Sequence, residues 1–249
     1  VPAGAAQNAA ATANTVSNMA TVTYDTTAPT AMVTPNGTTT ATSPITFTMT
    51  FSEAVTGLTA AGVTVTNGTK GALSGGPTQY TIPVTPTAQG VVTCQVPSGA
   101  ARDAAGNNNT ASNNASVNYN TAALTCIVTP NGTSTNGSTI TFTMAFSEAV
   151  SGLAVAEITV TNGTKGALGG GPAQYTIAVT PTAQGGVTCQ VPAGAAQNTA
   201  GTANTASNAA SVNYDTVAPT AVVAPDGTTT ANSPITFTMT FSEAVTGLT

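Results

Sequence analysis

Three carboxylates of the sequence are spaced so that they could share a metal ion. Asp25 precedes the first predicted strand of a repeating unit, Glu53 follows the second strand, and Asp103 lies in the last hairpin loop. In a sandwich whose loops meet at one pole, these side chains would gather at a junction between repeats. Carboxylates together with backbone carbonyls suit Ca²⁺, which takes oxygen ligands. Calcium at repeat junctions is therefore the alternative to our default interpretation, a polar loop cap without any cofactor.

The next copy of the unit weakens the calcium hypothesis. Its equivalent positions hold Asn120, Glu148 and Asn198, which leaves one carboxylate of three. Neutral amides contribute no charge to balance a divalent cation, so a site of this kind could not recur along the chain in the same form. From the sequence we therefore assign no metal ligand and no cofactor-binding residue.

The sequence offers no recognisable catalytic machinery. It contains no His, the commonest general base and transition-metal ligand. Ser-Glu pairs recur at Ser52, Ser147 and Ser242, where a strand enters a loop, and exposed loop polarity explains them. The Gly-rich stretches 74–77 and 169–172 lack the Gly-Lys-Ser/Thr of a phosphate-binding loop, and they predict hairpin connections. We predict that the chain is not an enzyme and has no catalytic residue.

Cysteine usage differs between the copies. Cys94 and Cys189 are equivalent and fall on inward strand positions, whereas Cys126 stands where the other copies have Ala31 and Ala221. A bridge between Cys126 and Cys189 would staple the first strand to the sixth, but Cys94 would still lack a partner. We favour small core residues over a disulfide, and the bridge stays open at this point. Glycosylation also stays open, because the Asn-Gly-Thr sequences are equally well explained as tight turns.

The spacing of all these residues follows a tandem repeat of 95 residues. Tyr24, Tyr119 and Tyr214 open the same motif, and the two complete copies are identical at 69 of 95 positions. A period of this kind indicates an array in which one repeat explains the whole chain. The predicted domains are the end of a preceding repeat (1–23), two complete repeats (24–118 and 119–213) and the start of a following repeat (214–249).

The sequence begins and ends inside a repeat. Even if the partial repeats at its two ends were joined, 36 of the 95 positions of a repeat would be missing. An incomplete sandwich exposes half a core and open strand edges. We therefore expect the chain to be a window on a longer polypeptide, or neighbouring chains to complete both ends.

Strict alternation of apolar and polar residues predicts the elements that position these side chains. Ile45, Phe47, Met49 and Phe51 alternate with hydroxyl residues, which indicates a half-buried strand. Turn residues such as Asn67-Gly68 separate the runs. The fold class is all-β, with tandem immunoglobulin-like antiparallel β-sandwiches joined end to end, and a barrel is the second choice. Strands are predicted at 30–35, 44–53, 61–67, 70–73, 78–86, 90–97 and 113–120.

The joint between repeats is predicted to be short, because the last strand of one repeat runs almost directly into the first strand of the next. Pro29 and Pro219 stiffen this connection in two copies. Leu124 stands at the same position in the middle copy, which predicts a joint that bends more easily there.

Several motifs also resemble a known family. The runs Asp25-Thr-Thr-Ala-Pro-Thr, Phe51-Ser-Glu-Ala-Val-Thr-Gly-Leu-Thr and Asp103-Ala-Ala-Gly-Asn are similar to the bacterial immunoglobulin-like tandem repeats of giant extracellular adhesins and surface proteins. The resemblance covers the full repeat in order. It implies an extracellular or cell-surface location and a load-bearing or spacing role. It also implies that calcium could stiffen the joints, since giant adhesins of similar build are often stiffened in that way.

The composition of the chain limits the kinds of partner that it could bind. Only 4% of the residues are charged, and the formal net charge is −5 with three basic side chains. Such a chain lacks the electrostatic footprint for nucleic acid, and no apolar run is long enough to insert into a membrane. Low charge favours association with neighbouring copies of the same repeat, in the same chain or in other chains.

We expect an extracellular structural protein that builds or forms part of a surface filament or biofilm fibre. The alternative is the spacer stalk of a giant adhesin that presents a distal binding domain.

Overall fold

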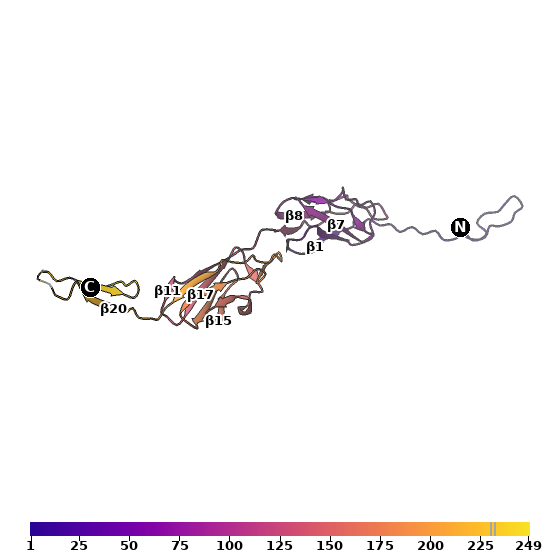
Figure 1. The fold of residues 1–249 in the computed structure, drawn as a ribbon. Coiled ribbons are helices and arrows are strands. Elements are labelled where there is room, and N and C mark those ends of the chain that lie inside the picture. Colours follow the sequence, from indigo (N-terminus) through magenta and orange to yellow (C-terminus); the bar gives the residue numbers. More distant parts are fainter. Residues whose placement is uncertain (230, 232) are drawn as a thin grey trace. The chain divides into compact units, whose positions relative to one another are not determined.

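The computed structural model of the chain describes residues 1–229, 231 and 233–249. These residues divide into two compact units, Val1–Thr121 and Ala122–Thr249. Each unit contains one β-sandwich made of two sheets (Figure 1), so the predicted all-β fold of tandem immunoglobulin-like sandwiches is confirmed. The one helical segment among the described residues is a single 3-10 turn, η1 (Val155–Glu157). No helix in the described part of the chain is long and apolar enough to cross a membrane.

The first unit packs two sheets against each other. One sheet has the strand order β1-β3-β7-β5, with β6 also paired to β7, and the other has the order β2-β9-β8-β4. Pairing is antiparallel except for β2, which runs parallel to β9. The strands are β1 (Ala31–Pro35), β2 (Thr39–Thr40), β3 (Ile45–Phe51), β4 (Thr64–Thr66), β5 (Gly68–Lys70), β6 (Ser74–Gly75), β7 (Gln79–Pro86), β8 (Gly90–Gln95) and β9 (Ala115–Tyr119).

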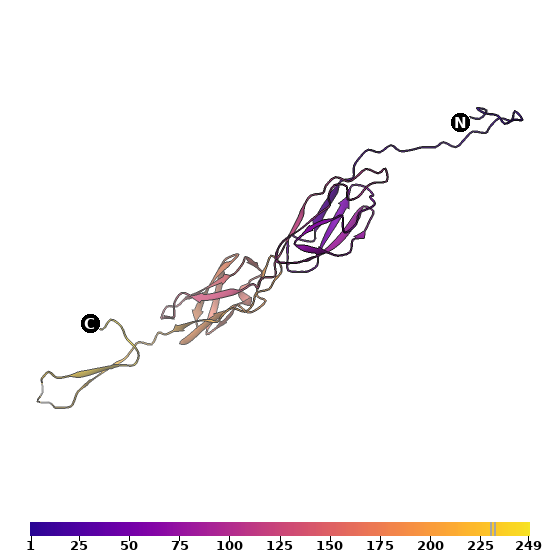
Figure 2. The same cartoon turned by 90° about the horizontal axis from the view of Figure 1, so that it is seen from above.

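The second unit repeats this plan and adds a hairpin. Its sheets have the orders β10-β12-β16-β15 and β11-β19-β17-β14, and β13 pairs with β18 at the rim. The hairpin β20–β21 is drawn as a separate two-stranded ribbon in Figure 2. The strands are β10 (Cys126–Pro130), β11 (Ser134–Thr135), β12 (Ile140–Phe146), β13 (Val150–Ser151), β14 (Thr159–Thr161), β15 (Gly163–Gly170), β16 (Gln174–Pro181), β17 (Gly185–Gln190), β18 (Gln197–Asn198), β19 (Ala210–Tyr214), β20 (Ala221–Pro225) and β21 (Phe237–Phe241).

The inward residues of both sheets form a separate apolar core in each unit. On β3, Ile45, Phe47 and Met49 are fully buried, and the hydroxyl residues between them face outward, as the alternation predicts. All three cysteine thiols are buried and free, Cys126 and Cys189 in the second core and Cys94 in the first. Burial raises the pKa of each thiol to about 11, which keeps it protonated and unreactive near neutral pH.

Three details of the predicted strands were wrong. The strand expected at 70–73 is replaced by the short strands β5 and β6, and the prediction omitted β2 altogether. Two residues of parallel pairing carry too little periodicity to be recognised in a sequence. The expected strand at 61–67 is shorter than predicted, because only Thr64–Thr66 pair with β8.

Pro83 explains why β5 and β6 are separate strands. Its carbonyl accepts a hydrogen bond of 2.7 Å from the amide of Gly71, on the side of β7 that faces β5 and β6. In a strand the N–H and the carbonyl of one residue point to the same side, and proline has no N–H, so the second hydrogen bond of this pair cannot form. The second unit has Ala178 at this position, and there one eight-residue strand, β15, pairs along β16 with a bulge between Lys165 and Leu168. A single proline therefore decides whether this sheet edge is continuous.

Leu124 also lies where the sequence did not predict it. It is fully buried in the second core, and its carbonyl accepts a hydrogen bond from the amide of Thr205. The carbonyl of Pro29 accepts the same bond from Thr110 in the first unit. This position is therefore an anchored part of the sandwich that follows it, and leucine serves there as a core residue.

An asparagine side chain closes the open edge of the first strand in each unit. The amide of Asn113 accepts a hydrogen bond from the Val33 N–H (2.8 Å) and donates one to the Val33 carbonyl (2.9 Å). Asn208 does the same to Val128 at 2.9 and 2.8 Å. The side chain thus takes the place of a neighbouring strand and leaves no free pair of backbone groups at this point of the edge.

We expect Asn113→Ala to lower the free energy of unfolding of the first unit by about 1–2 kcal/mol, because both polar groups of buried Val33 lose their partner. Equilibrium denaturation in urea measures the change. The control is Asn114→Ala, since the second unit already carries Ala209 at that position. Equal stability of the two variants would show that the amide bridge contributes nothing.

Candidate functional site

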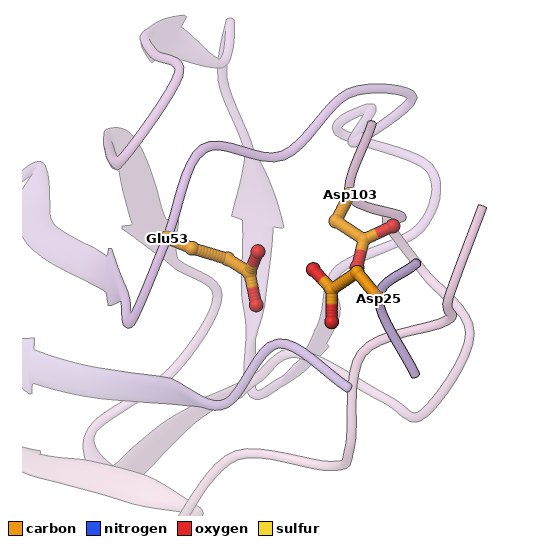
Figure 3. Close-up of side chains that lie close together, drawn as sticks. All are labelled: Asp25, Glu53 and Asp103. Atoms are coloured by element: carbon orange, nitrogen blue, oxygen red, sulfur yellow. The ribbon is translucent and has the colours of Figure 1, made fainter. Parts of the chain in front are cut away.

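The structure brings Asp25, Glu53 and Asp103 together at one end of the first sandwich. One carboxylate oxygen from each lies within 4.8 Å of the others. Figure 3 shows the three side chains converging from separate segments: the residues before β1, the loop after β3, and the loop between β8 and β9. Asp25 and Glu53 border a hollow of about 360 Å³ whose remaining lining is Thr23, Ala54, Ala104 and Ala105.

Asn107 organises two of the three acids. Its backbone N–H and its side-chain amide each donate to a carboxylate oxygen of Asp103 at 2.9 Å. The same side-chain amide donates to the backbone carbonyl of Asp25 at 3.1 Å. Asp103 is 4% exposed. One asparagine therefore fixes a buried carboxylate and ties the start of the repeat to its last loop.

The loop that carries Glu53 is held on both sides. Ser52 Oγ accepts a hydrogen bond from the Thr30 N–H (3.0 Å), while the Ser52 N–H donates to the Thr30 carbonyl (2.9 Å). The Tyr80 hydroxyl donates to the Val55 carbonyl at 3.1 Å. The serine of the repeated Ser-Glu pair is thus a clamp between β1 and β3, a role that the sequence analysis missed.

The electrostatics of the cluster differ between its members. Burial, followed by the negative charges of Asp103 and Asp25, raises the pKa of the Glu53 carboxyl. The hydrogen bond from the Asn107 side chain lowers the pKa of Asp103, and backbone N–H groups of the same loop add to that effect. At neutral pH the site therefore concentrates negative charge, part of which hydrogen bonds stabilise and part of which only a cation would neutralise.

The second unit replaces this arrangement with a direct hydrogen bond. Asn198, the counterpart of Asp103, is buried, and its amide donates to a carboxylate oxygen of Glu148 at 3.4 Å. The Asn198 side-chain oxygen accepts the N–H groups of Ala200 and Thr202. The substitution of Asn for Asp thus keeps the loop fold and exchanges a repulsive contact between carboxylates for an attractive one.

Sequence reasoning identified the three acids but not the residues that position them. Asn107 and Ser52 were visible in the sequence as parts of the motifs that contain Asp103 and Glu53. The spacing of four residues from Asp103 to Asn107 was a usable signal, because an acid at the start of a tight loop commonly accepts hydrogen bonds from residues that follow it.

Without divalent cations, we expect Glu53→Gln to stabilise the protein above about pH 5 and to have no effect below about pH 4. Glu53 has a raised pKa in the folded state, so the wild type loses stability as pH rises through the ordinary Glu pKa towards the folded value. Asp103→Asn should destabilise the protein at neutral pH, and this effect should disappear at low pH. The lowered pKa of Asp103 contributes stability that is present at neutral pH and is lost as pH falls through the folded value.

Thermal unfolding from pH 3 to pH 8 with a chelator measures both effects. Glu157→Gln is the control, since it removes one exposed carboxylate of the second unit and changes the net charge equally. A Glu53→Gln curve parallel to that of the wild type at every pH would contradict the proposed repulsion.

Comparison with known proteins agrees with this fold. The sequence model described as "Bacterial Ig-like domain" matches residues 25–121 and again residues 119–214. A comparison with curated proteins gives no significant match.

Two solved adhesin structures are among those similar to the chain. One is invasin, described as a bacterial integrin-binding protein, with 17% identity, a TM-score of 0.43, and coverage of 85% of this chain and 47% of that one. The other is the Yersinia pseudotuberculosis adhesin InvE, with 17% identity, a TM-score of 0.28, and coverage of 74% and 58%. The chain thus spans about half the length of these two structures. Because the family model matches most of the sequence in two consecutive copies, the chain belongs to the bacterial Ig-like domain family.

Proposed function

We propose that this chain is an extracellular structural protein whose tandem bacterial Ig-like repeats build, or form part of, a surface filament. The observation that carries the proposal is the repetition of nearly identical sandwiches. Two sandwiches that agree at 69 of 95 positions each have their own apolar core. Nearly identical, self-contained units suit a protein whose role is to span a distance, because the contour length of the chain grows with each added unit.

The location of the charges supports the filament form of this proposal. Asp25, Glu53 and Asp103 lie at one end of the first sandwich, and the ammonium of the exposed Lys70, on the edge strand β5, donates to the Val63 carbonyl at 2.8 Å. Lys165 does the same to the Ile158 carbonyl at 2.8 Å. Little charge is left on the sheet faces to keep two copies of the chain apart.

A spacer stalk is the second form of the same structural role. In that case each sandwich satisfies its own core, the chain acts singly, and the adhesive function resides in another domain. The two forms differ in one observable property, because a filament requires contacts between copies and a stalk does not.

Electron microscopy of the native surface material distinguishes the two forms. For the filament we expect fibres of constant width in which several copies lie together, labelled along their length by an antibody raised against the repeat. Single thin threads, each labelled and never bundled, would contradict the filament and favour the stalk. Cells grown without expression of the chain are the control for labelling.

Calcium binding at Asp25, Glu53 and Asp103 is a second candidate function, favoured by the distance of 4.8 Å or less between their oxygens. Carboxylate oxygens so arranged, together with nearby backbone carbonyls, match the ligand preference of Ca²⁺. The second unit does not share this feature, because Asn120 and Asn198 replace two of the three acids and Asn198 donates a hydrogen bond to the remaining one, Glu148.

We expect Ca²⁺ to raise the unfolding temperature of the first unit and leave that of the second unchanged. The reason is that an ion that binds only the folded state stabilises it by mass action. Differential scanning calorimetry of the full chain with Ca²⁺ and with a chelator measures this. Asp103→Asn, which copies the second unit, should abolish the shift. A shift that persists in this variant would place the ion elsewhere.

A further inference from the structure

The outer face of the β1-β3-β7 sheet carries hydroxyl groups in cross-strand rows. Thr34 pairs with Thr48, and Thr48 pairs with Thr81, so that three threonines stand side by side on adjacent strands. In the second unit Thr129, Thr143 and Thr176 form the same row. We call this surface the threonine face. Strand side chains alternate in direction, so the residues in these rows all point away from the core.

One large apolar side chain protrudes from the threonine face at the same position of each unit. Met32 is 62% exposed on β1 and lies opposite Thr50. Ile127 is 60% exposed on β10 and lies opposite the exposed Ala145. The other sheet lacks such a repeated feature, because Val91 is 56% exposed in the first unit but its counterpart in the second unit is Gly186.

The threonine face carries no charged residue in either unit. The outward side chains on β1, β3 and β7 are threonine, glutamine, proline and methionine, and those on β10, β12 and β16 are threonine, glutamine, alanine and isoleucine. Two copies of such a surface meet without repulsion and without desolvating an ion. A partner of strong charge would gain nothing from it, whereas a second copy of the same surface is matched in polarity.

The edges of the same sheet are less suited to association. Asn113 and Asn208 occupy the edge of the first strand in the two units. At the opposite edge, Pro83 interrupts the pairing in the first unit, and a bulge between Lys165 and Leu168 distorts β15 in the second. Such devices discourage the addition of a foreign strand. Contact through the face is therefore more consistent with the structure than pairing at the edge.

We propose that the threonine face binds the threonine face of a second copy of the chain, with Met32 and Ile127 as the apolar anchors of the contact. This inference rests on the filament form of the proposed function and names the surface that the filament would use. Each single contact is small, and tandem units on one chain raise its effective affinity through repeated engagement.

Charge insertion tests the proposal on the full chain. The double variant Met32→Glu/Ile127→Glu places a carboxylate on the threonine face of each unit. The control, Ser116→Glu/Ser211→Glu, places the same charges at equivalent exposed positions of the opposite sheets. Analytical ultracentrifugation and electron microscopy measure the concentration at which each protein assembles. We expect this concentration to rise at least about tenfold for the first variant and to stay within about twofold of the wild type for the control.

A complementary variant tests whether the two faces meet each other. Met32→Lys/Ile127→Lys should assemble poorly alone, and an equal mixture with the glutamate variant should assemble again, because opposite charges then oppose one another. Unimpaired assembly of the glutamate variant, equal impairment of the control, or no recovery on mixing would overturn this proposal and leave the filament intact. A wild-type chain that stays monomeric at every concentration would overturn the filament itself.

Discussion

The burial of alternate side chains between two sheets is the constraint on which the rest of this protein depends. On β3 and its counterpart β12, every second residue is apolar and fully enclosed, and the residues between them are mostly threonine. Because a strand has two faces, enclosing one set of side chains fixes the direction of the other set. The same alternation that builds the core therefore also builds the outer surface, and both recur with each repeat.

The ends of the sandwich are held together by hydrogen bonds of polar side chains and not by apolar burial. Loops must satisfy their own backbone groups, and this protein does so with short polar side chains: Ser52 clamps Thr30, and Asn107 binds Asp103. These clamps bring carboxylates together in the first unit. In the second unit Asn120 and Asn198 replace two of the acids, and Asn198 donates a hydrogen bond to Glu148. Repeats with nearly the same fold can therefore differ in charge at their ends, and this is where variation between copies has chemical consequences.

Low charge has two physical effects that act together. It removes the repulsion that normally keeps parallel surfaces apart, and it makes uncontrolled strand pairing a greater hazard. The structure limits the hazard at the edges through Asn113, Asn208 and Pro83, and it leaves the broad faces open. Closed edges and open faces would suit the ordered association that we propose.

The sequence by itself determined the period of 95 residues, the all-β class, the inward positions of Phe47 and Cys189, and the set of acids that meets at the pole. It could do so because alternation and repetition are local patterns that survive without knowledge of distant contacts. The tertiary structure alone decided the parallel pairing of β2, the division of β5 from β6, the burial of Leu124, and the edge bridge from Asn113 to Val33. These features join residues up to 81 positions apart, and their energies depend on which backbone groups the folded sheets leave unpaired. No local pattern records that information, because an asparagine that bridges a strand edge and one that faces water look the same in a sequence.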